Sequence, residues 1–189
     1  TEKDKIAIAC KDEIIVFRNS IDLARFYPKA QNKYDSLYLP RNTFHTGALD
    51  IHDLNFGSND ELFAVNTLFS SIVKIDDNYN FTPYWTPHFI DKIASEDRCH
   101  LNGMAMKNKK PKYASAFSSG NTPQSWRKNI TNSGIIIDIE NNNIIAEGLG
   151  MPHTPRIFNN ELYVLLSATG ELIKINTKDG GYEIITQID

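Results

Sequence analysis

The sequence repeats at a spacing of 50 residues, and this period constrains the fold more than any other feature of the chain. Three short segments of largely apolar residues carry an aromatic side chain at the same place, namely Phe63, Tyr113 and Tyr163. Short apolar segments bounded by turn residues are typical of β-strands. Repeats of 40 to 50 residues that hold several strands are typical of β-propeller blades.

The segments around each aromatic strand repeat as well. Each unit has an opening strand upstream, and two further strands downstream that are joined by a polar turn. The turns are rich in Asn, Asp and Gly, which tolerate positive φ and form local hydrogen bonds. We expect opening strands at 50–56, 100–106 and 153–158, and turns at 77–80, 140–143 and 177–181. Four short strands in about 50 residues match one propeller blade.

We therefore predict an all-β fold: a β-propeller of four-stranded antiparallel blades, with about four blades in this chain, as a complete or a partial ring. Residues 1–189 form one domain, and the expected blades are 5–47, 48–90, 98–149 and 151–189. The first blade lacks its opening strand, and its outer strand is expected at 36–39. We expect either a longer natural protein or a partner chain that covers the ends. An open β-sandwich is the alternative, and the period argues against it.

Composition excludes several partners. No apolar run approaches the roughly 20 residues of a membrane span, and the first residues lack a signal-peptide pattern, so we expect a cytoplasmic protein without a membrane partner. Net charge is −3, and the one basic cluster, 107–110, falls in an expected hairpin turn, so nucleic acid is not expected as a partner. The two cysteines, Cys10 and Cys99, are expected to be reduced thiols rather than a bridge.

Three histidines stand near the start of successive opening strands. His52, His100 and His153 are separated by 48 and 53 residues, close to the repeat. The first strand of a blade lines the central channel, so equivalent positions point at one axis. Three neutral imidazoles could bind a transition metal and leave a coordination position open, with Asp53 orienting one ring. The alternatives are hydrogen bonding around a wet channel and direct acid–base use of a histidine.

Other polar residues are expected near the same channel mouth. The candidate catalytic residues are His100, Glu96, Asp97 and Arg98. The candidate ligand-binding residues are Asp53, Asn66, Asn102, Arg98, Arg156 and Trp126. The arginines could hold a carboxylate or phosphate with two parallel hydrogen bonds, or they could pair with Glu96, Asp97 or Asp53 and brace the blades.

A long insertion, 118–133, interrupts the third unit and is rich in Ser, Asn, Thr and Gly. Loops of such length are often functional. Trp126 in its middle, beside Arg127, could grip a sugar ring or an anion, or it could pin the loop to the blade. His45 and His88 lie off the repeat and are expected in loops.

Six short motifs stand out along the chain: Tyr38–Arg41, His45–Gly47, Asp50–Asp53, Asn66–Ser70, Glu96–Gly103 and Met151–Arg156. They resemble those of an uncharacterised bacterial family known as DUF4915 or TIGR03032. The octet Glu-Asp-Arg-Cys-His-Leu-Asn-Gly is the most specific of them. The resemblance spans 34–170 and implies a propeller-like β protein, with no established reaction, substrate or cofactor.

Three hypotheses for function follow. The channel mouth binds a small polar or anionic ligand, for example a sugar. Alternatively, the chain is a metal-dependent enzyme, a hydrolase, lyase or oxygenase, that uses the three histidines. In the third hypothesis the chain is an assembly module that forms a homo-oligomer through open blade edges. Repeated histidines on the channel axis favour the first two, because a scaffold does not need them.

Overall fold

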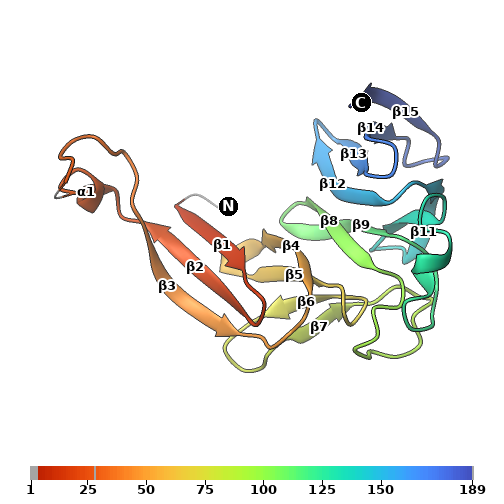
Figure 1. Ribbon diagram of the computed structural model, residues 1–189, viewed down its shortest axis with the longest axis horizontal. Coiled ribbons are helices and arrows are strands. Elements are labelled where there is room, and N and C mark those ends of the chain that lie inside the picture. Colours follow the sequence, from red (N-terminus) through yellow and green to blue (C-terminus); the bar gives the residue numbers. More distant parts are fainter. Residues whose placement is uncertain (1–3, 28, 189) are drawn as a thin grey trace.

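The computed structural model describes residues 4–27 and 29–188, which form fifteen strands in four antiparallel sheets (Figure 1). The first sheet contains β1 (Lys5–Ala9), β2 (Glu13–Asn19) and β3 (Tyr38–His45). The second contains β4 (Ile51–Phe56), β5 (Leu62–Asn66), β6 (Ser71–Ile75) and β7 (Thr82–Trp85). The third contains β8 (Leu101–Lys107), β9 (Lys110–Ala116), β10 (Gly134–Asp138) and β11 (Asn143–Leu149). The fourth contains β12 (Pro152–Phe158), β13 (Glu161–Leu166), β14 (Glu171–Ile175) and β15 (Tyr182–Gln187).

Helical structure is confined to connections between strands. The described residues contain a short α-helix, α1 (Ile21–Ala24), and two 3-10 segments, η1 (Ser58–Asp60) and η2 (Ser125–Lys128). Within the described ranges, no helix is long and apolar enough to cross a bilayer.

The sheets follow one another in chain order around an open arc (Figure 1). Strand order within each sheet follows the sequence, so every strand pairs with its neighbour along the chain. The opening strands pack on one another from sheet to sheet, β4 against β8 and β8 against β12. Adjacent opening strands at the inner edge of successive sheets are the arrangement of propeller blades. The all-β propeller prediction is therefore confirmed.

The first sheet differs from the sequence-based prediction in its outer strand. The strand was expected at 36–39, but β3 runs from Tyr38 to His45. The seven-residue β2 offers a long partner, and pairing continues until Glu13 meets His45. The prediction that His45 lies in a loop is therefore wrong, whereas His88 does lie in a turn. A register shift between Val16 and Phe17 places an extra residue, Arg41, in β3.

The core consists of three apolar layers, one between each pair of neighbouring sheets. The central strands are buried on both faces. In β5, Leu62 and Ala64 face the first sheet, whereas Phe63 and Val65 face the third. Because alternate side chains point to opposite faces, one strand contributes to two layers. This explains why β5 is largely apolar rather than alternating in polarity.

The two cysteines are free. Cys10 is exposed, and Cys99 lies in the layer between the second and third sheets. Burial raises the pKa of the Cys99 thiol to about 12, so the thiol stays protonated and unreactive at neutral pH.

Gly103 in β8 allows the third and fourth sheets to approach closely. A Cβ atom at this position would lie 2.5 Å from Pro155 Cδ and 2.8 Å from Ser115 Oγ. Both distances are far shorter than van der Waals contact. The prolyl ring cannot rotate away, so a side chain at position 103 would force β8 and β12 apart.

We predict that Gly103→Ala lowers the free energy of unfolding by about 1–3 kcal/mol, the usual cost of overpacking a well-packed layer. Urea denaturation measures the change. Gly181→Ala is the matched control, because its added Cβ would meet only the flexible Asp179 carboxylate, at 3.2 Å. Equal effects of the two substitutions would contradict the steric argument.

Candidate functional site

The strand register corrects the expected equivalence of the three histidines. Ile51, Leu101 and Pro152 occupy the same place, because they pair with residues 66, 116 and 166 of the following strands. His52 and His153 are therefore equivalent, but the third sheet has Asn102 at this position. His100 lies two residues earlier, directly before β8. The offset could not be seen from the sequence, because both separations, 48 and 53 residues, are close to the 50-residue repeat.

The residue before each opening strand adopts the left-handed conformation. Asp50, His100 and Met151 have φ values of 53°, 51° and 53°. Such values are uncommon outside glycine and persist only where surrounding contacts hold them. This conformation turns the chain into the opening strand at the channel mouth. It places the His100 ring beside His52 although the two residues are not equivalent in register.

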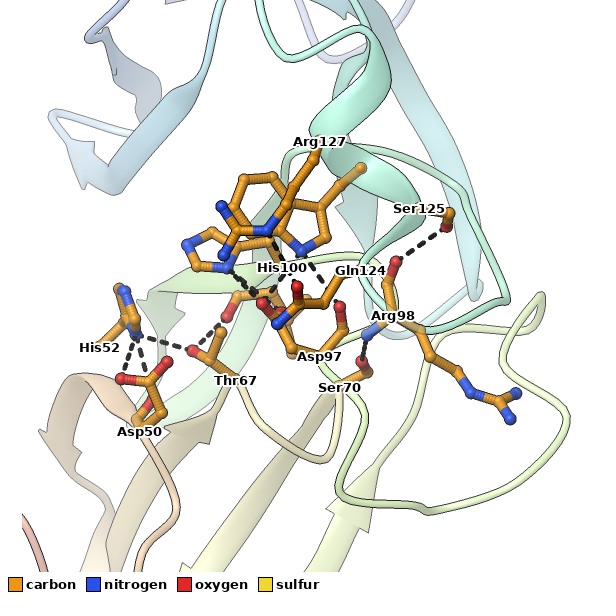
Figure 2. Close-up of polar contacts among 12 residues, drawn as sticks. Asp50, His52, Thr67, Ser70, Asp97, Arg98, His100, Gln124, Ser125 and Arg127 are labelled. Carbon is orange, nitrogen blue, oxygen red and sulfur yellow. Dashed lines mark hydrogen bonds and ion pairs between the residues drawn. The ribbon is translucent and has the colours of Figure 1, made fainter.

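His52 and His100 meet edge to face, with ring centroids 4.9 Å apart (Figure 2). The His100 ring also lies against Phe117 at 4.5 Å and Trp126 at 4.3 Å. His153 contacts the other side of this cluster through Phe117, at 5.0 Å. The structure thus brings the three histidines of three blades into one cluster, which we call the channel-mouth site.

A buried carboxylate orients His100. Its Nδ1 lies 3.1 and 3.2 Å from the two carboxylate oxygens of Asp97, whose side chain is 9% exposed. Trp126 Nε1 donates to the same carboxylate at 2.9 Å. Because the carboxylate accepts, the proton of the neutral His100 ring sits on Nδ1. Nε2 is then the free hydrogen-bond acceptor.

A hydroxyl orients His52 in the same way. The Thr67 hydroxyl donates its hydrogen to the buried Leu101 carbonyl at 2.6 Å. It can therefore only accept from His52 Nδ1, 2.9 Å away, and the Asp50 carbonyl at 3.0 Å also accepts. The neutral His52 ring carries its proton on Nδ1 and exposes Nε2 as an acceptor.

Sequence reasoning missed two residues that support the histidines, Thr67 and Phe117. Both stand directly after the second strand of their sheets and are 50 residues apart, with Ser167 at the third equivalent place. Ser167 Oγ donates to the Met151 carbonyl at 3.0 Å. The 50-residue repeat could have identified these residues, because the residue at the equivalent place in each blade contacts the start of the opening strand.

His153 is partly buried and makes no hydrogen bond or ion pair among the described residues. Its pKa is lowered, first by burial and then by the positive charges of protonated His100 and His52. At neutral pH its imidazole is therefore uncharged.

The described residues include no group of three or more His, Cys, Asp and Glu side chains arranged to hold a metal ion. His52 and His100 meet edge to face, and Phe117 packs against both His100 and His153. Metal binding by His52, His100 and His153 stays a prediction.

Arg98 and Glu96 form a separate network. The Arg98 side chain is 6% exposed and extends away from His100 (Figure 2). Its nitrogens lie 2.7 Å from Glu96 Oε2 and 2.6 Å from Asp91 Oδ1, and Asn121 also accepts, at 2.7 Å. These bonds lower the pKa of Glu96 and Asp91. The arrangement agrees with the alternative that Arg98 braces the loops.

Arg156 and Asp53 connect three sheets. Two parallel hydrogen bonds of 2.9 and 3.1 Å join the Arg156 guanidinium on β12 to the Asp53 carboxylate on β4. The Met104 amide on β8 donates to the same carboxylate at 3.1 Å, and the Met104 carbonyl accepts from Arg156 at 3.0 Å. The bridge agrees with the alternative that Arg156 pairs with Asp53 and braces the blades. Because both oxygens of Asp53 are used in it, Asp53 does not orient a histidine.

Asn66 and Asn102 are buried near the channel-mouth site. The Asn102 carbonyl oxygen accepts from Ser115 at 2.6 Å, and that of Asn66 accepts from the Phe69 amide at 3.2 Å. The two Nδ2 groups are buried without a partner. The two side chains are 0% and 3% exposed, and ligand binding by Asn66 and Asn102 stays a prediction.

Trp126 is 5% exposed, and its indole closes the cluster from the insertion 118–133. The Arg127 guanidinium lies over the Trp126 ring, 4.2 Å from its centroid, and its Nε donates to Gln124 at 3.1 Å. The terminal nitrogens of Arg127 have no partner among the described residues. Trp126 thus pins the insertion, and Arg127 is the exposed cation beside it.

A family model described as "Domain of unknown function (DUF4915)" matches residues 1–189. No curated protein sequence matches the chain significantly. Similar solved structures include a catalytically inactive virginiamycin B lyase from Staphylococcus aureus with quinupristin, at 14% identity and a TM-score of 0.46, covering 100% of this chain and 57% of that chain. The selenomethionine-substituted lyase has 14% identity and a TM-score of 0.41, covering 93% and 52%. The chain spans little more than half the length of these lyase chains.

We predict that His153 titrates below 6.5 in histidine NMR spectra and that its pKa rises in both His52→Gln and His100→Gln. Each substitution removes one positive neighbour. Because the folded-state pKa is the lower one, this group contributes stability above pH 6.5 that is lost as pH falls through its folded pKa. A His153 titration that neither substitution moves would show that the three imidazoles do not interact.

Proposed function

This chain belongs to the DUF4915 family, and we propose that its channel-mouth site binds a small, hydroxylated, anionic ligand of the sugar-acid class. The observation that carries the proposal is the paired orientation of His52 and His100. Both rings use Nδ1 for an internal hydrogen bond, and Nε2 of each ring has no partner among the described residues. Two fixed acceptors on adjacent rings suit neighbouring hydroxyl groups of one ligand.

Arg127 supplies the charge preference. Its guanidinium is held over Trp126 and retains free terminal donors beside the histidine cluster. A guanidinium with free donors suits a carboxylate, because two parallel hydrogen bonds match its geometry. Of the carboxylates around the site, Asp97 accepts from His100 and Trp126, and Asp53 is bonded to Arg156. Asp50 is 57% exposed, and its carboxylate lies 3.8 Å from His52 Nδ1.

D-Glucuronate is the probe, and calorimetric titration measures its binding. We expect saturable binding that weakens about tenfold in His52→Gln and in Arg127→Gln, the loss of one charge-assisted or buried hydrogen bond each. D-Glucose, which lacks the carboxylate, should bind more weakly than D-glucuronate. His45→Gln is the control, because His45 is 84% exposed, ends the outer strand of the first sheet and is not part of the channel-mouth site. Absence of binding, or an equal loss in the control, would contradict the proposal.

Proton transfer by His100 is the second candidate function. The Asp97–His100 hydrogen bond favours it, since a buried carboxylate that holds Nδ1–H fixes the tautomer in which Nε2 accepts a proton. His100 is then the proton acceptor, Asp97 positions it, and Glu96 and Arg98 take no part because they are bonded to each other. Metal-dependent chemistry and homo-oligomer formation through blade edges stay predictions.

We predict that Asp97→Asn moves the His100 proton from Nδ1 to Nε2. Trp126 Nε1 donates to Asp97 Oδ2 at 2.9 Å, so the asparagine carbonyl takes the place of Oδ2 and the NH2 group takes the place of Oδ1, 3.2 Å from His100 Nδ1. An NH2 donor beside Nδ1 favours the tautomer in which Nδ1 accepts and Nε2 carries the proton. Long-range proton–nitrogen NMR correlations distinguish the two tautomers. His52, which Thr67 orients, is the internal control and should not change. An unchanged His100 tautomer would contradict the assigned role of Asp97.

A further inference from the structure

A pocket lies between the first and second sheets, at the opposite end of the strands from the histidines. Its volume is about 230 Å³. It is lined by Lys5, Val16, Arg18, Arg41, Asn42, Phe44, Phe56, Asp60, Leu62 and Ile75. Phe56 ends β4 and Leu62 begins β5, whereas His52 lies at the start of β4.

The floor of this pocket is apolar. Phe56, Leu62 and Ile75 belong to the buried layer between the first two sheets, and Val16 and Phe44 pack against that layer. A ligand that lies on this floor therefore removes apolar surface from water, which stabilises the complex.

The rim of the pocket is cationic. Lys5 and Arg18 stand directly opposite each other on β1 and β2. Like charges in direct cross-strand register destabilise a sheet. Arg41 adds a third cation from the bulge in β3, and bulges commonly re-aim a side chain. Three adjacent strands thus place three positive charges around one pocket.

Protein groups compensate only part of this charge. Asp60 is the carboxylate among the lining residues, and it pairs with Lys5 at 2.5 Å. Within the described ranges, the guanidinium groups of Arg18 and Arg41 form no hydrogen bond or ion pair. Two guanidinium groups above an apolar floor are the complement of an anion with an apolar body.

We propose that this pocket binds a small carboxylate with an apolar body, such as a short fatty acid or an aromatic acid. The volume equals that of about eight waters, at roughly 30 Å³ each, and accommodates on the order of ten non-hydrogen atoms. The carboxylate pairs with Arg18 and Arg41, and the hydrocarbon lies on Phe56, Leu62 and Ile75. The site is independent of the channel-mouth site, because the two share no residue.

Hexanoate is the probe, and the NMR methyl signals of Leu62 and Ile75 are the readout. We expect these signals to shift saturably with hexanoate, and the dissociation constant to rise about tenfold or more in the double variant Arg18→Gln/Arg41→Gln. Arg25→Gln is the matched control, because Arg25 is an exposed arginine outside the pocket. Acetate keeps the carboxylate but lacks the long hydrocarbon, and hexanol keeps the hydrocarbon but lacks the carboxylate. Both should bind at least tenfold more weakly than hexanoate.

Three outcomes would overturn the proposal: no saturable shift at millimolar hexanoate, equal affinity in the double variant, or acetate binding as tightly as hexanoate. Circular dichroism of the double variant establishes that it remains folded, so a loss of binding is assigned to the guanidinium groups. Shifts confined to the histidine signals would place the ligand at the other site and would also overturn the proposal.

Discussion

The burial of apolar faces between successive sheets is the interaction on which the rest of the structure depends. No strand pairing joins one sheet to the next within the described residues, so the hydrogen bonds between paired strands hold each sheet together but do not connect the sheets. Three apolar layers supply the cohesion between sheets, together with polar links such as the Arg156–Asp53 bridge, the Lys5–Asp60 ion pair and the hydrogen bond from Thr67 to Leu101. The close approach at Gly103 shows how tightly one of these layers is packed.

The histidines of the channel-mouth site are fixed by hydrogen bonds to neighbouring side chains, and those side chains are fixed in turn by hydrogen bonds of their own. Thr67 can orient His52 only because its hydrogen is committed to Leu101, and Asp97 orients His100 while accepting from Trp126. Supporting groups of this kind fix both the ring plane and the position of the proton. These internal bonds leave Nε2 of both rings as the acceptor.

The repeat predicted the strands well because alternation and turn residues are local signals that survive in every blade. It failed where one residue changes the register: counting along the chain made His100 the equivalent of His52, but the strand pairing gives that place to Asn102. Arg98 pairs with Glu96, as the bracing alternative expected, and also with Asp91, an acceptor that the repeat does not mark. The cationic pocket was not predicted, because Arg41 reaches it only through the bulge in β3, and the sequence does not show where that bulge lies.

The three histidines come from three different sheets, and this origin gives the channel-mouth site a mechanical role. Their spacing depends on the angles at which the second, third and fourth sheets meet. Any molecule that contacts all three at once therefore links the blades, and the tighter it binds the stiffer the arc becomes. Conversely, a strain that rotates one blade against the next would pull the contact points apart and weaken the hold on that molecule.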